Sequence, residues 1–187
     1  FSGVPFHIMK DILSIARTEV FLTFMVRDVN RFLKSSKHWI SIEELYGIDN
    51  VQEVIDSTYS NLPREQALLK LYRDRLHKDA GVKYTFPFLV CADKRLQTTY
   101  YLIHATNHPL GCKLMKGIMY RTGTEGRFGY LGPAEGQVRL DSYDKSSFKD
   151  FLLNRFGGRT LSFKEVIYET LMETCFVEKD YRDILKD

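Results

Sequence analysis

The sequence is poor in cysteine and has no paired metal-ligand motif. Its 187 residues contain three widely separated cysteines, Cys91, Cys112 and Cys175. An odd number of separated cysteines with no Cys-x-x-Cys pair is typical of free thiols in a reducing cytoplasm, and not of a disulfide framework or a structural zinc site. His104 and His108 are four residues apart, but they lie in a predicted strand end that runs into Pro109, so they would not share a helix face. The sequence therefore predicts a cytoplasmic protein without a metal site.

The sequence also has no apolar run long enough for a membrane span and no excess of one charge. The apolar stretch Val20–Val26 is interrupted by Thr23 and followed by Arg27, whereas a membrane helix needs about 20 apolar residues. There are 27 basic and 24 acidic residues, a net charge of +3. This balance allows a nucleic-acid partner without indicating one, because phosphate-binding surfaces normally show a clustered basic patch. With 44% hydrophobic residues, the composition is that of a folded globular protein with no membrane partner.

An initiator methionine and a signal peptide are missing as well. The chain opens on Phe1-Ser-Gly-Val-Pro5, which is typical of a loop, and it ends at Asp187 within a predicted helix. We interpret it as an internal piece of a longer protein.

Hydrophobic periodicity predicts an α/β arrangement in the first half of the chain. Pro5 begins a helix whose apolar residues recur at helical spacing to about Arg17. The nearly continuous apolar run Glu19–Met25 predicts a strand buried on both faces, as in a parallel sheet. Short helices are expected within Arg27–Asn61, followed by a long helix that Pro63 opens and Gly81 closes.

A hairpin is predicted next. The strand-like runs Val82–Cys91 and Leu96–Ala105 are joined by turn residues. Pro87 has no amide donor, which favours a sheet edge or a bulge at that position. A helix follows over Pro109–Tyr120, with Thr106 or Asn107 as its expected cap.

The last third of the chain predicts a flexible linker and a small helical unit. Five of the twelve glycines fall within Arg121–Gly136, which indicates a linker. Helices are then expected over Ser146–Phe156, from a capping box at Ser162 and Glu165, and from Glu178 to the end. The predicted organisation is an α/β domain at residues 1–121, a linker at 122–143 and a partial winged-helix-like region at 144–187.

Three segments carry a family resemblance. They are Phe1-Ser-Gly-Val-Pro-Phe6, the run Glu19–Phe32, and Tyr101-Leu-Ile-His-Ala-Thr-Asn-His-Pro109. These segments resemble the three-Cys-motif partner proteins, and the tail Ser162–Ile184 is similar to that family's carboxyl-terminal winged-helix region. The resemblance spans nearly the whole chain and its motifs are moderately specific.

This resemblance implies a bacterial protein with a fold like that of class I S-adenosylmethionine-dependent methyltransferases. The expected fold is the second half of a Rossmann-like sheet that ends in an antiparallel hairpin, followed by the helical region. It implies action on nucleic acid or a related substrate, and pairing with a radical-enzyme-like protein that carries the three cysteines of the family name. The alternative is a non-catalytic methyltransferase-like scaffold that binds a partner protein or nucleic acid.

The cofactor site of such a protein is not expected within this chain. Family members carry a glycine-rich strand–turn–helix upstream of the position of Phe1, together with an Asp-Pro-Phe-Gly stretch directly before it. A glycine-rich turn lets the backbone approach a nucleotide-like cofactor closely, and the only glycine cluster, Gly123–Gly136, does not follow a predicted strand. S-adenosylmethionine is therefore expected to bind only to a longer protein.

The substrate site is predicted at the carboxyl end of the strand Glu19–Met25, where ligands bind in open α/β sheets. Arg27 and Arg31 could grip a carboxylate or phosphate, while Asp28 and Asn30 could orient a base or a ribose hydroxyl. The opposing interpretation is an internal Arg–Asp ion pair with Asn30 as a local cap. Catalytic residues are not identified. Lys94 and Arg95, in the hairpin turn, would return to the same edge, although an exposed turn is the simpler interpretation.

DNA binding by the tail is not predicted from its charge. Residues 138–187 contain nine basic and ten acidic side chains, a net charge of −1. Phosphate contacts dominate nucleic-acid affinity, so the tail suits a protein partner as well as DNA.

Overall fold

The computed structural model describes residues 3–33, 35–91, 98–123, 129–130, 145–174 and 176–186. Its centre is a sheet with the strand order β1-β3-β2-β4, formed by β1 (Val20–Phe24), β3 (Thr98–Thr106), β2 (Tyr84–Cys91) and the short β4 (Gly129–Tyr130). β3 pairs antiparallel with both β1 and β2, and β4 pairs parallel with β2. The fold is therefore mixed α/β around a mainly antiparallel sheet.

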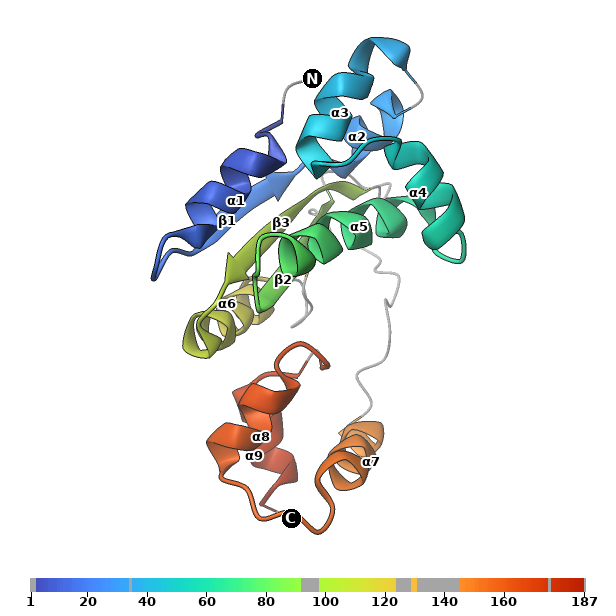
Figure 1. The fold of residues 1–187 in the computed structure, drawn as a ribbon. Helices are drawn as coiled ribbons and strands as arrows, with labels where there is room; N and C mark the ends of the chain where they lie inside the picture. The colour runs from blue at the N-terminus through green and yellow to red at the C-terminus, as the bar shows by residue number, and fades with distance from the viewer. Residues whose placement is uncertain are drawn as a thin grey trace.

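One face of the sheet is covered by the helices of the first half of the chain (Figure 1). They are α1 (Phe6–Ser14), α2 (Val26–Phe32), the 3-10 turn η1 (Ser36–His38), α3 (Trp39–Tyr46), α4 (Val51–Thr58) and α5 (Arg64–Lys78). The core between these helices and the sheet is rich in aromatic residues. Tyr72 of α5 stacks on Phe24 of β1 with ring centroids 5.0 Å apart, and the ring of Phe6 in α1 makes a T-shaped contact with Tyr72. Such contacts fix α1 and α5 against the sheet.

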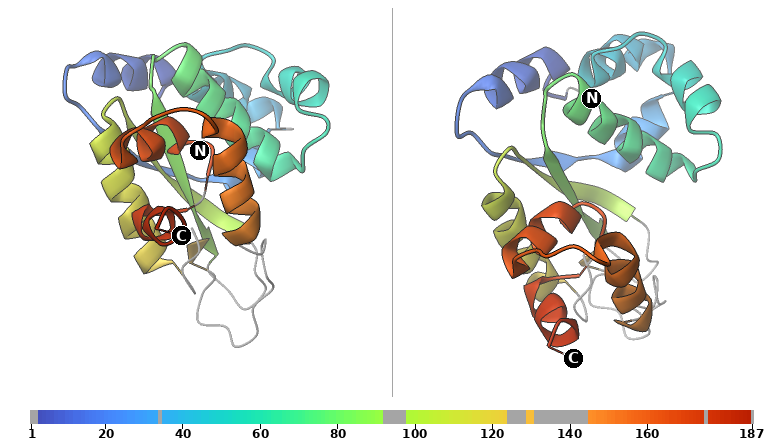
Figure 2. Two further views of the ribbon diagram at one scale, coloured as in Figure 1. Left: turned by 90° about the horizontal axis from the view of Figure 1, so that it is seen from below. Right: turned by 60° about the horizontal axis from the view of Figure 1, so that its bottom comes forward.

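The opposite face carries α6 (Pro109–Thr122), on which the carboxyl-terminal helices pack (Figure 2). These helices are α7 (Lys145–Phe156), α8 (Phe163–Thr170) and α9 (Glu178–Ile184). Their apolar core is continuous with Cys112 of α6 and with Tyr84 of β2. Lys116 of α6 is buried and donates hydrogen bonds to the carbonyl oxygens of Leu171 and Thr174, at 3.2 and 2.6 Å. The helical unit is thus fastened to the α/β part by both apolar and polar contacts.

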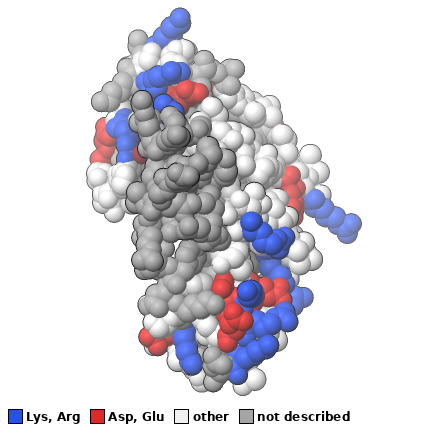
Figure 3. Space-filling model, turned by 180° about the vertical axis from the view of Figure 1, so that it is seen from behind, with Lys and Arg blue, Asp and Glu red and all other residues white. Residues whose placement is uncertain are grey.

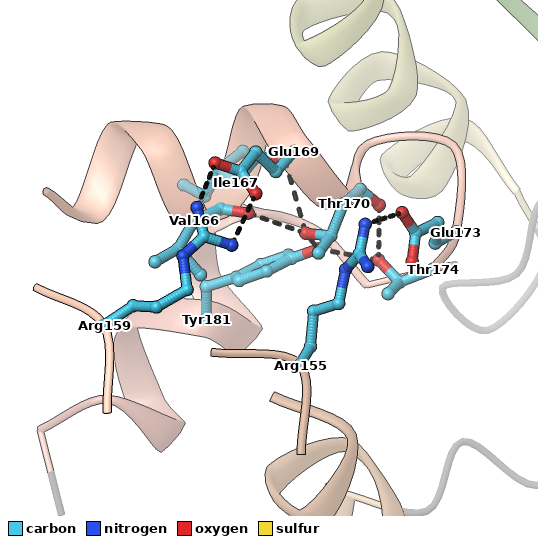
Figure 4. A network of polar contacts seen from close by, with 9 residues as sticks. All are labelled: Arg155, Arg159, Val166, Ile167, Glu169, Thr170, Glu173, Thr174 and Tyr181. Carbon is cyan, nitrogen blue, oxygen red and sulfur yellow. Dashed lines mark hydrogen bonds and ion pairs between the residues drawn. The ribbon is translucent and has the colours of Figure 1, made fainter. Parts of the chain in front are cut away.

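Buried hydroxyl groups and surface ion pairs hold the helical unit together (Figure 4). The hydroxyl of Tyr181 lies 2.6 Å from Thr170 Oγ1 and 2.7 Å from Thr174 Oγ1. On the surface, Arg159 makes two hydrogen bonds to Glu169. Because an unpaired hydroxyl is costly to bury, the Tyr181 contacts fix α9 against α8.

Most of the predicted elements are confirmed. The hairpin strands pair antiparallel and extend the sheet that contains β1. β2 is an inner strand between β3 and β4, but β4 pairs with it only at Leu89 and Val90, so in the described sheet Pro87 has a partner on β3 alone. The capping box at Ser162 and Glu165 is also present. Among the described helices, none is long and apolar enough to cross a lipid bilayer.

The prediction that the strand Glu19–Met25 is buried on both faces is wrong. In β1, Phe24 is buried, but Phe21 is 54% exposed and Thr23 is exposed. The helical layer covers the face that bears Phe24, whereas on the opposite face, which carries α6 over β2 and β3, Phe21 of β1 remains exposed. In the described sheet β1 is an edge strand whose one neighbour is the antiparallel β3. The apolar run therefore predicted the strand correctly, but the prediction that both of its faces are buried does not follow from the run alone.

Two further observations concern the region after the hairpin. The predicted linker at residues 122–143 contains the strand β4, while residues 124–128 and 131–144 lie outside the described part. The described residues of the predicted winged-helix-like region 144–187 form three helices and no strand. A helical unit is thus present.

Candidate functional site

The predicted substrate residues lie on α2, which follows β1 almost without a loop. β1 ends at Phe24 and α2 begins at Val26. Val26 and Val29 are buried against the core, and this amphipathic spacing turns Arg27, Asp28 and Arg31 outward. All four predicted residues are therefore near the carboxyl end of β1, although on a short helix and not in a loop.

Arg31 and Asp28 form an exposed ion pair one helical turn apart. Arg31 Nη2 lies 3.0 Å from Asp28 Oδ1, and the Arg31 side chain is 67% exposed. The guanidinium also lies 4.4 Å from the ring centroid of Phe32. An exposed pair at this spacing contributes only about 0.5 kcal/mol, so Arg31 can exchange Asp28 for an incoming anion at little cost. This pair is local to α2.

Asn30 points elsewhere and is held by a different element. Its Oδ1 accepts a hydrogen bond of 3.0 Å from Arg64 Nε at the start of α5. Arg64 also donates to Gln52 and lies 3.5 Å from Asp56 of α4. The structure therefore separates Asn30 from the other three residues and gives it a contact that joins α2, α4 and α5.

A hollow of about 360 Å³ lies over the remaining residues. It is lined by Met25, Arg27, Asp28, Arg31 and Thr99, so β3 closes its side opposite α2. Two guanidinium groups and one carboxylate give the lining a net positive charge. Such a hollow can bind a phosphate or carboxylate through the arginines, while Thr99 and Asp28 offer further polar groups. The turn residues Lys94 and Arg95, predicted at the same edge, lie outside the described part of the chain.

The charge on the back of the molecule is mixed (Figure 3). Around the carboxyl-terminal helices, Lys and Arg side chains alternate with Asp and Glu, for example where Arg182 pairs with Glu178 at 2.8 Å. A broad phosphate-binding surface needs unpaired cations in one patch. In this view the described side chains at these helices thus carry charges of both signs.

A second polar cluster, which the sequence did not predict, lies at the other end of the strands, where β1 begins and β3 ends. Glu19 precedes β1, and its carboxylate lies 3.0 Å from His104 Nε2 and accepts a hydrogen bond of 2.9 Å from Thr106 Oγ1. Desolvation raises the pKa of Glu19, but the hydrogen bonds from His104 and Thr106 outweigh it, so the pKa lies below its ordinary value. The other imidazole nitrogen of His104, Nδ1, is buried and has no hydrogen-bond partner among the described residues. Only strand pairing could have revealed this cluster, because Glu19 and His104 are far apart in sequence.

This second cluster joins the sheet to the start of α6. His108 is the cap of α6, since its Nδ1 accepts a hydrogen bond of 3.2 Å from the amide of Leu110. The expectation that Thr106 or Asn107 caps the helix is therefore wrong. Asn107 instead accepts from the amide of Lys83, and Thr106 accepts from the amide of His108. Pro109 opens the helix as predicted.

The described cysteines are buried thiols. They are Cys91 and Cys112, while Cys175 lies outside the described residues. Burial raises the pKa of Cys112 to about 11, so its thiolate is scarce at neutral pH. Within the described ranges, no three His, Cys, Asp or Glu side chains are placed to hold a metal ion.

The described strand-to-helix turns contain no glycine. β1 passes into α2 at Met25, and β3 passes into α6 through Asn107 and His108, so neither turn contains glycine. A side chain at these positions keeps a pyrophosphate or a cofactor carboxylate away from the backbone.

In comparisons with known proteins, no family model, no curated protein and no solved structure matches this chain.

Proposed function

We propose that this chain is the substrate-binding half of a methyltransferase-like α/β domain of the three-Cys-motif partner type. Its substrate is nucleic acid or a related anionic molecule, bound in the hollow between α2 and β3. A longer protein that contains the chain supplies the S-adenosylmethionine site and pairs with a radical-enzyme-like protein. The reducing cytoplasm is the compartment that suits its buried thiols.

The observation that carries this proposal is the order of the strands. β1 and β2 run in the same direction, and the antiparallel β3 lies between them. Sheets of class I methyltransferases end in such an arrangement. In open α/β sheets the ligand lies beyond the carboxyl ends of the parallel strands, and here that edge holds Arg27 and Arg31. The alternative, a non-catalytic scaffold, is favoured by the exposed Phe21 of β1, which lies at the edge of the described sheet and suits contact with another protein.

The substrate site is tested by fluorescence anisotropy. A short fluorescein-labelled single-stranded RNA is titrated with the chain at a series of salt concentrations. The double variant Arg27→Ala/Arg31→Ala is expected to bind more weakly and to lower the slope of log affinity against log salt by about 1.4, because two phosphate contacts are lost. Its free energy of unfolding should change by no more than about 0.5 kcal/mol, since Arg31 is exposed.

The matched control is Arg159→Ala/Arg182→Ala, which removes the same charge from two exposed ion pairs of the helical unit. This control should retain the wild-type salt slope. Equal loss in both double variants would assign the affinity to net charge and remove the hollow from the proposal. A large fall in the stability of Arg27→Ala/Arg31→Ala would instead make the arginines structural.

Calorimetry with S-adenosylmethionine tests the second part of the proposal. The 187-residue chain is expected to give no saturable heat, because its described strand-to-helix turns lack the glycine that close approach to such a cofactor requires. Saturable binding would place the cofactor site on these residues and contradict the division of the domain that we propose.

A further inference from the structure

A groove with an apolar floor lies between α3 and α4. Figure 1 shows these two helices at the end of the molecule away from the carboxyl-terminal helices. Its volume is about 570 Å³. Leu33, Ile42 and Val51 are buried residues that line it, and Trp39 forms part of its wall. Trp39 is 55% exposed and the next residue, Ile40, is 73% exposed. An exposed tryptophan at an apolar groove is the kind of side chain that anchors protein interfaces.

The walls of this α3–α4 groove are acidic on both sides. Glu43 projects from α3, while Glu53 and Asp56 project from α4. Among the described residues that line the groove there is neither Lys nor Arg. The sequence from Trp39 to Pro63 contains five carboxylates and no basic residue, although the whole chain has a net charge of +3. Arg64 of α5 offsets part of this charge, since its Nη1 lies 3.5 Å from Asp56 Oδ1.

The carboxylates that line the groove differ in their hydrogen bonds and in their exposure. Glu43 Oε1 accepts a hydrogen bond of 2.8 Å from the amide of Asn50 and so shapes the turn between the two helices. Glu53 is exposed. Asp56 accepts a hydrogen bond from Gln52 and pairs with Arg64, but its side chain is still 58% exposed. A cation that enters the groove therefore meets carboxylates from two helices. The Trp39 ring can add a cation–π contact to these charges.

From these features we propose that the α3–α4 groove binds a basic, amphipathic segment of a partner protein. The occupant presents apolar side chains to the floor and Lys or Arg to Glu53, Asp56 and the ring of Trp39. An amphipathic helix in an apolar groove is a common recognition mode, and complementary charge selects its partner. Phosphate groups would be repelled by the same carboxylates, so this surface differs in its ligand from the hollow at Arg27 and Arg31.

Trp39 is the only tryptophan of the chain, and its fluorescence reports on the groove directly. The probe is a synthetic helical peptide with Leu on one face and Lys on the other, and its twin has Glu in place of Lys. The Lys peptide should cause a saturable change in Trp39 emission, whereas the Glu peptide should cause none. If the emission changes with the concentration of the protein alone, the occupant is a second copy and the proposal fails.

Two variants locate the binding. Glu53→Gln/Asp56→Asn should weaken the Lys peptide roughly ten-fold, as the loss of two exposed charge contacts implies. Trp39→Ala, measured by anisotropy of a labelled peptide, should weaken it roughly thirty-fold. The control Asp11→Asn/Asp150→Asn removes the same charge from exposed sites on α1 and α7 and should bind as the wild type does.

Thermal melts of each variant establish that it is folded. Equal affinity of wild type and Glu53→Gln/Asp56→Asn, or equal weakening in the Asp11→Asn/Asp150→Asn control, would overturn the proposal. The RNA titration of the chain is unaffected by either result, so failure of this proposal and failure of the proposed substrate site are distinguishable.

Discussion

Replacement of Lys116 by alanine is expected to lower the free energy of unfolding by about 3 kcal/mol, because hydrogen bonds from a charged donor to buried acceptors are among the strongest in proteins. Lys116 is 2% exposed. Its ammonium donates to the carbonyl oxygens of Leu171 and Thr174, where α8 ends, and lies 5.5 Å from the ring centroid of Phe86. A cation at the carboxyl end of a helix also interacts favourably with the helix dipole. Urea denaturation measures the loss.

The matched control is Lys113→Ala, one turn earlier on α6. Lys113 also reaches the helical unit, with Nζ 2.6 Å from Glu178 Oε2, but both side chains are partly exposed. Its removal should cost no more than about 1 kcal/mol. Lys116→Met retains the apolar stem and should recover about 1 kcal/mol of the loss. Equal stability of Lys116→Ala and Lys113→Ala would show that α6 holds the helical unit by apolar contacts alone.

A reader of the sequence could have predicted most elements but not Lys116. Hydrophobic periodicity identified the helices α1, α5 and α6 and the hairpin strands, because each depends on local spacing. Lys116 is one of many lysines in the sequence. Its burial depends on the position of Leu171, which is far along the chain. Tertiary contacts between distant segments leave no local signal.

The same limit explains the errors at β1 and at the start of α6. An apolar run such as Val20–Phe24 cannot reveal that one face lacks cover, because the cover comes from other elements. At α6, Asn107 and Thr106 are ordinary cap residues, but both are engaged by partners outside the helix, the amide of Lys83 and the carboxylate of Glu19. His108 then takes the cap position. Which residue caps α6 therefore depends on which polar side chains already have other hydrogen-bond partners.

The site residues divide along the same line. Arg27, Asp28 and Arg31 could be placed together because they are neighbours in sequence after a strand. Asn30 could not be separated from them without knowledge of Arg64, which reaches it from α5. Adjacent positions on a helix point in different directions. Proximity in sequence alone therefore assigns too many residues to a site.

Gly111→Ala is expected to destabilise the protein by about 2 kcal/mol, although alanine normally stabilises a helix interior relative to glycine by about 1 kcal/mol. Gly111 lies in the first turn of α6, and a Cβ there would overlap the carboxylate of Glu19. That carboxylate cannot move without breaking its hydrogen bonds to His104 and Thr106. His104 would then be buried with both ring nitrogens unpaired, because Nδ1 already has no partner among the described residues.

Gly117→Ala on the same helix separates this effect from helix propensity. A Cβ at Gly117 would meet only Arg121, at 3.7 Å from Nη1, which is an ordinary contact. The control should therefore gain about 0.5–1 kcal/mol, and the two alanine variants should shift the urea midpoint in opposite directions. If both variants stabilise the protein, Glu19 is free to move, and the cluster of Glu19, His104 and Thr106 does not fix the start of α6. Opposite signs would establish that the carboxylate is held in place by its buried partners, since the two substitutions have the same chemistry and differ only in what the added methyl group meets.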